Sequence, residues 1–324
     1  MERPGMRVGL HLDDRLMSGA DGIGRRRFAG LLASAAGLPL LGGLGFGRAA
    51  MAADVPLSPP TRTYPLFEEA VSRVVPEAGF QSGIAFGDSI LRLLRHGVID
   101  RGKLFALYGT SGGLPAELAR ALQQRSPQKL LLTAANAGYA VNLLWPIGLA
   151  TAMAANVESP LNGESLYHFA STGGWTLGRE PNGGAYFSRY PIVDLTEDAE
   201  ALVVRIAKST HRPCCNNSTF FQDCNHGSAL LGLLQLGASQ GLGQDELYRE
   251  ALAFNSFWFP QYYIRTALYF KIAKWTDWND VDPRVVLGYD YSAGGPWQEN
   301  VGSPIAAIQG LIPEEPDGSA ACAL

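Results

Sequence analysis

The chain has 324 residues, of which 47% are hydrophobic and 17% are charged, so it is long enough to bury a large core. Its formal net charge is −4, and no run of Lys or Arg occurs after the N-terminal region, so no nucleic-acid partner is expected. The 38 glycines and 20 prolines predict many loops, but they follow no repeat.

Residues 1–53 have the pattern of an export signal. The basic segment Arg25-Arg26-Arg27-Phe28 precedes an uncharged stretch of small and apolar residues, and Ala50-Met51-Ala52 then forms an A-x-A cleavage site. The R-R-x-F pattern with a Gly/Ala-rich core resembles a twin-arginine export signal. The resemblance implies a cleaved signal, a partner in the twin-arginine export machinery, and a periplasmic or secreted location.

Removal of this signal segment makes the chain more acidic, because the segment contains seven arginines and only four acidic residues. The resemblance also implies transport of an already folded protein, a route that often serves proteins loaded with a cofactor before export. A bound metal ion in the exported domain is therefore favoured.

The remaining chain predicts one mainly α-helical domain over residues 54–312, with long Gly-rich loops, and a disordered tail over 313–324 that contains Cys322. Strand patterns are scarce, and the segment after Pro283 is expected to be irregular. Asp194 and Glu197 predict a capping box at the start of one helix. Apolar residues at helical spacing predict helices over residues 65–75, 84–96, 100–108, 115–124, 195–210, 228–241, 244–257 and 261–275.

Residues 130–157 contain no charged residue and would be long enough to span a bilayer. Three asparagines and Pro146 interrupt the stretch, however, and these residues are costly in lipid. We therefore predict one buried central helix, kinked near Pro146, and no stable membrane span in the exported chain.

The strongest chemical signal is the segment from His211 to His226, which contains three of the four cysteines and two of the five histidines. Its pattern, H-x2-C-C-x8-C-x-H, does not match the spacing of common zinc modules. The segment connects two predicted helices, whose packing should bring His211 back towards Cys224 and His226. Backbone N–H groups at the start of the second helix should lower the pKa of Cys224. The candidate metal ligands are His211, Cys214, Cys215, Cys224 and His226.

Three interpretations of this cluster remain open. A metal ion, with zinc as the first choice, explains why Cys and His occur together. A disulfide from Cys214 or Cys215 to Cys224 would suit an extracytoplasmic protein. A catalytic thiol could pair with His211 or His168 from elsewhere in the fold.

The sequence as a whole predicts an exported extracytoplasmic protein with a Cys/His metal site, expected to be an enzyme, although no motif assigns a reaction. The alternative is a non-catalytic protein, stabilised by a disulfide, that binds a small molecule or a glycan.

Aromatic residues are frequent between residues 254 and 278. They could stack on sugar rings, but packing between two helices is the interpretation that their spacing favours.

Overall fold

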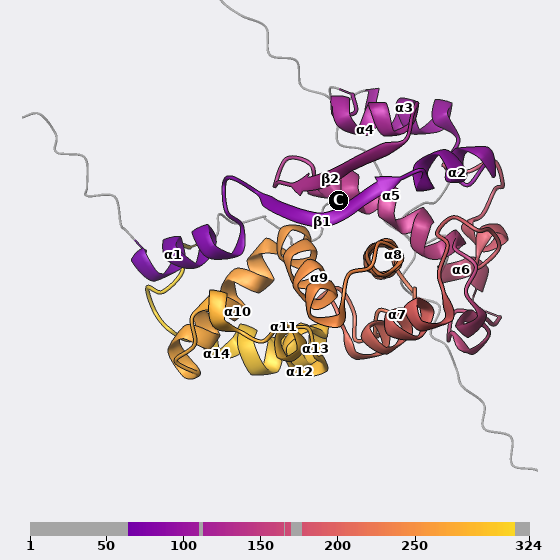
Figure 1. Cartoon of the computed structure of the whole chain (residues 1–324). Coiled ribbons are helices and arrows are strands. Elements are labelled where there is room, and N and C mark those ends of the chain that lie inside the picture. Colours follow the sequence, from indigo (N-terminus) through magenta and orange to yellow (C-terminus); the bar gives the residue numbers. More distant parts are fainter. Residues whose placement is uncertain (1–63, 110–112, 165, 170–176, 315–324) are drawn as a thin grey trace, which may run out of the picture. The chain divides into compact units, whose positions relative to one another are not determined.

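The structure is a computed structural model that describes residues 64–109, 113–164, 166–169 and 177–314 (Figure 1). These residues belong to one compact unit that begins at Pro60. They form mainly helices and a single two-stranded sheet, which confirms the predicted mainly α class. The predicted signal segment 1–53 and most of the predicted tail, including Cys322, lie outside the described residues.

Two helices form the centre of the fold, α5 (Ala137–Ala150) and α8 (Asn225–Ser239), and they pack more extensively on each other than any other pair of elements. Both are apolar around most of their circumference, which is the pattern of a helix covered on all sides. Gly148 and Gly232 allow the two backbones to touch. A Cβ atom at Gly148 would lie 1.9 Å from the carbonyl oxygen of Ser228, and one at Gly232 would lie 2.3 Å from that of Leu144.

Further helices surround this pair. α7 packs on α8 as predicted, α9 packs on both α8 and α10, and α1 packs on α10. For α1, α7, α8, α9 and α10 the predicted boundaries agree with the observed ones to within a few residues, whereas α6 was not predicted. The bounds are α1 (Pro65–Val74), α2 (Ser89–Arg95), α3 (Arg101–Gly109), α4 (Ala116–Ala121), α6 (Leu166–Phe169), α7 (Glu197–Ser209), α9 (Gln244–Trp258) and α10 (Pro260–Ala273).

A small antiparallel sheet replaces part of two predicted helices. β1 (Phe80–Gly87) pairs with β2 (Ser126–Leu132) and packs on α8 and α9. The prediction of a helix over residues 84–96 is therefore wrong for its first turn, and helix α2 begins only at Ser89. The apolar run fits either a buried strand or a buried helix, and periodicity alone does not separate the two.

Side chains from distant helices complete the hydrogen bonding of β1 where its register is irregular. The buried carboxylate of Glu250 accepts hydrogen bonds from the backbone N–H of Gly83 at 2.6 Å and from the hydroxyl of Ser82 at 2.7 Å. Gln240 accepts from the N–H of Ala85 at 3.0 Å and donates to its carbonyl at 2.8 Å. These contacts satisfy backbone groups of β1 that β2 leaves unpaired.

Two other predictions are corrected. The single kinked helix expected over residues 130–157 is three elements: the end of β2, helix α5, which continues through Pro146, and the short 3-10 helix η1 (Ala154–Glu158). The cap of α7 is Thr196, whose hydroxyl accepts from the N–H of Ala199 at 3.2 Å. Asp194 instead forms a two-point ion pair with Arg92.

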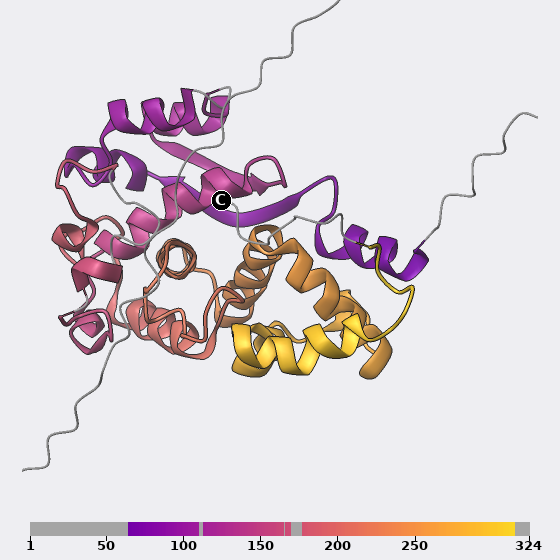
Figure 2. The same ribbon diagram turned by 180° about the vertical axis from the view of Figure 1, so that it is seen from behind.

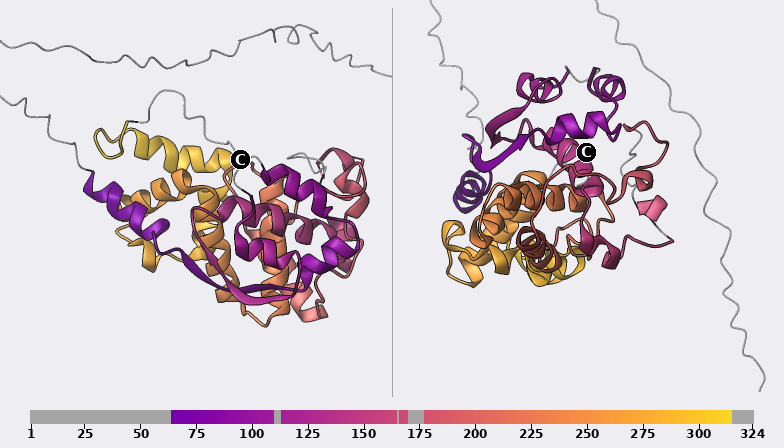
Figure 3. Two further views of the ribbon diagram at one scale, coloured as in Figure 1. Left: turned by 90° about the horizontal axis from the view of Figure 1, so that it is seen from above. Right: turned by 45° about the vertical axis from the view of Figure 1, so that its right-hand side comes forward.

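The segment after Pro283 is not irregular as predicted, but forms a series of short helices beside α9 and α10 (Figures 2 and 3). A Pro or Gly stands in the first turn or just before it in each of the short α-helices, which explains why the sequence pattern resembled a loop. The elements of this segment are α11 (Pro283–Val286), α12 (Tyr289–Ser292), α13 (Gly294–Trp297), the π-helix η4 (Gln298–Gly302) and α14 (Ser303–Ala306). Two short 3-10 helices precede it, η2 (Gly183–Tyr186) and η3 (Trp278–Asp280).

Within the described part of the chain, none of the helices combines the length and the apolar character that crossing a membrane requires.

Candidate metal centre

The cysteine cluster lies in the connector between α7 and α8, as the sequence predicted. The base of the connector is closed by Thr210 and Thr219, whose hydroxyls are 2.9 Å apart and whose backbones also bond. The N–H of Phe220 donates to the carbonyl of Ala207 at 3.0 Å. On the opposite side, the N–H of Gly294 donates to the carbonyl of Cys215 at 2.9 Å. The loop is thus held at both sides by backbone contacts.

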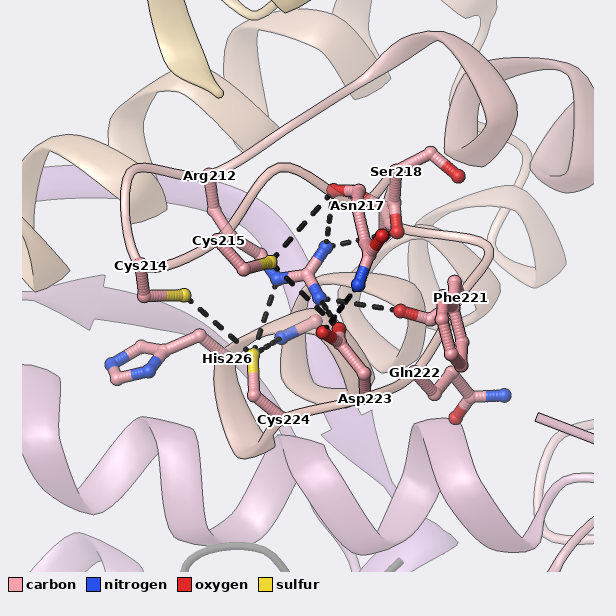
Figure 4. Close-up of polar contacts among 12 residues, drawn as sticks. Arg212, Cys214, Cys215, Asn217, Ser218, Phe221, Gln222, Asp223, Cys224 and His226 are labelled. Atoms are coloured by element: carbon pink, nitrogen blue, oxygen red, sulfur yellow. Dashed lines mark hydrogen bonds and ion pairs between the residues drawn. The ribbon is translucent and has the colours of Figure 1, made fainter. Parts of the chain in front are cut away.

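Arg212 organises the interior of this loop, and its side chain is completely buried. All five N–H groups of the guanidinium have an acceptor, which is the full donor capacity of an arginine. Nε donates to Cys224 Sγ at 3.2 Å, and the terminal nitrogens donate to three carbonyl oxygens and to Asp223 Oδ1 (Figure 4). The three carbonyls are those of Asn217 (3.0 Å), Ser218 (2.9 Å) and Phe221 (3.2 Å).

The guanidinium stays charged in this buried position. Burial lowers the pKa of Arg212, but the surrounding cysteines and Asp223 raise it above its ordinary value, so the group is a cation at neutral pH. Gly227 makes room for it, because a Cβ atom there would lie 2.5 Å from the guanidinium. A fixed positive charge therefore lies directly beside Cys224, at the first turn of α8.

The three cysteines of the cluster come together on the outer side of Arg212. The sulfurs of Cys214, Cys215 and Cys224 all lie within 4.8 Å of one another, and those of Cys214 and Cys224 are 3.6 Å apart (Figure 4). Cys214 is exposed, whereas Cys215 and Cys224 are partly buried. The cluster therefore has one sulfur at the protein surface and two deeper in the loop.

Cys224 is the preferred thiolate of the three. Hydrogen bonds from Cys214 and Cys215 lower the pKa of the Cys224 thiol well below its ordinary value, and the charge of Arg212 acts in the same direction. The N–H of Gly227 also donates to Cys224 Sγ at 3.3 Å, which makes Cys224 the N-cap of α8. The direction of the shift is the predicted one, but its causes are the neighbouring thiols and Arg212 and not the helix terminus. Hydrogen bonds with Cys215 and with Cys224, together with burial, raise the pKa of Cys214.

Asp223 links the thiols to the frame of the loop. Its carboxylate accepts from Arg212, from the amide of Asn217 at 2.6 Å and from the thiol of Cys215 at 3.8 Å. The carboxylate thus holds Arg212 and Cys215 in place without joining the group of sulfurs.

Neither predicted histidine ligand belongs to the group of close ligand atoms that the described residues form. The imidazole of His226 packs on Phe259, with 4.5 Å between ring centroids, and in Figure 4 it extends away from Arg212. The imidazole of His211 packs on Tyr289 at 5.3 Å. Burial lowers the pKa of His226 to about 4 and also lowers that of His211, so both rings are neutral at pH 7.

Buried polar atoms without a partner lie around the cluster. They are His226 Nε2, His211 Nδ1 and Asn255 Oδ1. The amide nitrogen of Asn255 does have a partner, because it donates to the carbonyl of His211 at 3.3 Å. Buried polar atoms in folded proteins are nearly always bonded to protein, water or an ion. Atoms of this kind are where a water molecule or another polar partner would bind.

This arrangement suits a soft or borderline metal ion. Thiolates bind zinc, copper(I) and iron–sulfur centres, and three thiolates around one ion leave a further coordination position for another ligand. Arg212 and the N–H of Gly227 donate to the sulfur of Cys224, the kind of outer contact that orients a metal ligand. The same three sulfurs could also form a disulfide or a reactive thiolate.

Arg212 and Asp223, the two residues that hold the cluster together, were not among the predicted site residues. The available signal was the position of Arg212, inside a segment dense in Cys and His and flanked by Pro213. An arginine there has acidic and sulfur acceptors within 12 residues. Its complete burial was not predictable, because three of its five acceptors are backbone carbonyls.

Comparison of the chain with protein-family models, with curated proteins and with solved structures found no match.

Proposed function

We propose that this chain is an exported protein that binds one thiophilic metal ion, zinc as first choice, through Cys214, Cys215 and Cys224. The observation that carries the proposal is the convergence of three sulfurs within 4.8 Å. Zinc–sulfur bonds of about 2.3 Å in tetrahedral geometry separate the sulfurs by roughly 3.8 Å. The cluster therefore needs only small side-chain rotations to close on an ion.

The charges around the cluster also support a cation. When no metal is bound, hydrogen bonding between the thiols favours ionisation of Cys224 and disfavours that of Cys214. A divalent ion would replace the thiol protons and neutralise most of the charge of the three thiolates, while Arg212 stays paired with Asp223. Because Arg212 is fixed and fully bonded, it would hold Cys224 in the same position with and without the ion.

We further propose that the metal-binding protein is an enzyme. Catalytic zinc sites have three protein ligands and leave one position for water or substrate, whereas structural sites are closed by four. Here the group of close ligand atoms contains three cysteines, and one of them, Cys214, is exposed. In this proposal His211 and His226 do not ligate the ion. The ligand set is therefore the three cysteines, without the two histidines that the sequence suggested.

Metal analysis of the purified protein and its variants tests the proposal. Cys224→Ser should remove the bound ion, because the deepest thiolate is lost, and His226→Ala should retain it. Retention of the ion by Cys224→Ser would contradict the three-sulfur site. Loss of the ion from His226→Ala would show instead that the site is closed by an imidazole.

Location outside the cytoplasm is proposed from the Arg25-Arg26-Arg27-Phe28 segment and the A-x-A site. Replacement of both Arg25 and Arg26 by Lys should leave the uncleaved precursor in the cytoplasm, as measured by cell fractionation and immunoblotting. A single substitution at Arg48 serves as the control, because it lies outside the twin-arginine pattern. Normal export of the double variant would contradict this route.

The second candidate is a non-catalytic binding protein that is stabilised by a disulfide. The separation of 3.6 Å between the sulfurs of Cys214 and Cys224 favours it, since small rotations would allow the bond to form under oxidising conditions. A disulfide closing a loop of this size contributes about 2–3 kcal/mol. It would not account for the third cysteine or for the unpaired imidazole nitrogens.

A further inference from the structure

A second site lies away from the cysteine cluster, in an open groove between α1, the outer face of α9 and the segment that contains η3 and α11. The groove has a volume of about 490 Å³. Its floor is apolar and buried, and Trp278 stands in its wall. The floor residues are Tyr248, Leu252, Phe257 and Val281.

Three arginines line this groove, one from each neighbouring helix: Arg73, Arg249 and Arg284. Arg284 is paired with Asp245 and Asp282 and lies over the ring of Tyr248, 5.5 Å from its centroid. Neither Arg73 nor Arg249 forms a hydrogen bond or an ion pair with any residue that the structure describes. In an acidic chain, two unpaired guanidinium groups in one groove indicate a site for an anion.

The groove continues into a second hollow of about 230 Å³, which shares Arg73, Trp278 and Asn279 with the first. The lining of the second hollow is more polar and includes Lys271, Asp277 and Asp280. The two hollows together form an elongated surface with cationic, carboxylate and aromatic groups. Such a surface suits an extended ligand better than a small molecule enclosed in a cavity.

We propose that this groove binds a carboxylate-bearing carbohydrate, namely an oligosaccharide that contains uronic acid. Arg73 and Arg249 would bind sugar carboxylates, for which the guanidinium offers a matching pair of N–H donors. Trp278 would stack on a sugar ring, and the carboxylates of the second hollow would accept hydrogen bonds from sugar hydroxyls.

The acidic residues of the groove disfavour a more densely charged polymer. Asp245 and Asp282 lie in the first hollow, and Asp277 and Asp280 lie in the second. They would repel a polyphosphate, whereas a uronic-acid chain has one charge per ring and hydroxyl donors between the charges. The inference is independent of the metal proposal, because the two sites share no residue.

Binding of tetragalacturonate to the full exported chain, measured by isothermal titration calorimetry and tryptophan fluorescence, tests this inference. Arg73→Gln, Arg249→Gln and Trp278→Leu should each weaken binding by about tenfold or more. Added salt should also weaken binding to the wild-type protein, because the contacts are exposed and charged. Maltotetraose, a neutral chain of the same length, should bind at least about tenfold more weakly.

Matched substitutions outside the groove provide the controls. Arg205 on α7 and Trp275, which is 90% exposed, do not line either hollow. Arg205→Gln and Trp275→Leu should keep the affinity within about twofold of the wild-type value. Equal binding of maltotetraose, wild-type affinity in the groove variants, or no measurable binding of tetragalacturonate would each overturn the inference. Melting curves confirm that every variant compared is folded.

Discussion

Arg212→Ala should lower the free energy of unfolding by about 3–5 kcal/mol, the range expected when one partner of a buried charged network is removed. The substitution leaves the carboxylate of Asp223 without its cation and removes the donors for three carbonyls and one sulfur. In a domain of this size the melting temperature should fall by roughly 10 °C. Thermal unfolding followed by circular dichroism measures both quantities.

Two further variants identify the cause of the lower free energy of unfolding. Arg212→Lys keeps the charge but offers three donors in place of five, so it should recover only part of the stability. Arg205→Gln removes an exposed arginine of α7 and should change the unfolding free energy by less than about 0.5 kcal/mol. Full stability of Arg212→Ala would contradict the role of Arg212 as the organiser of the loop.

Gly148→Ala should destabilise the protein by about 3 kcal/mol or more, at the upper end of the range for an enlarged core residue. The added Cβ would lie 1.9 Å from the carbonyl oxygen of Ser228, and this neighbour is backbone that cannot rotate away. α5 and α8 would have to separate, which loosens the most extensive helix contact in the fold. Unfolding by a chemical denaturant measures the decrease in the free energy of unfolding.

Gly109→Ala is the matched control, because a Cβ atom at this exposed end of α3 would meet nothing within 4 Å. Its unfolding free energy should stay within about 0.5 kcal/mol of the wild-type value. If Gly148→Ala were as stable as Gly109→Ala, the close approach of α5 and α8 would be wrong.

The helices that the sequence predicted well have a polar face or clear end signals. α7 and α9 begin with acidic residues and bury one side, and α10 begins at Pro260. In these segments local sequence and burial indicate the same structure. For the same reason the position of the cysteine cluster, between α7 and α8, was predictable.

β1 could not be predicted in the same way, because its hydrogen-bond partners are distant in sequence. Glu250 is 167 positions from Gly83, and Gln240 is 155 positions from Ala85. The run 80–94 is apolar and short, and such a run fits a strand or a helix equally well. The choice depends on tertiary contacts that no local pattern contains.

The residue types predicted the position of the cluster, but they could not predict which of its side chains would lie close enough together to bind one ion. Spacing placed His226 two residues after Cys224, yet their side chains leave the first turn of α8 in different directions (Figure 4). The sequence allowed either Cys214 or Cys215 to meet Cys224, and it did not show that the sulfurs of Cys214 and Cys224 would be the pair at 3.6 Å. That contact depends on the path of the loop around Arg212.

The most direct test of the metal proposal is elemental analysis of the purified exported protein, combined with a count of free thiols before and after chelation. We expect about one ion per chain, three thiols that become reactive only after chelation, and no disulfide. Cys322→Ser provides a background in which only the cluster cysteines are counted. Protein without metal, with two fewer free thiols until a reductant is added, would contradict the metal site and establish the disulfide in its place.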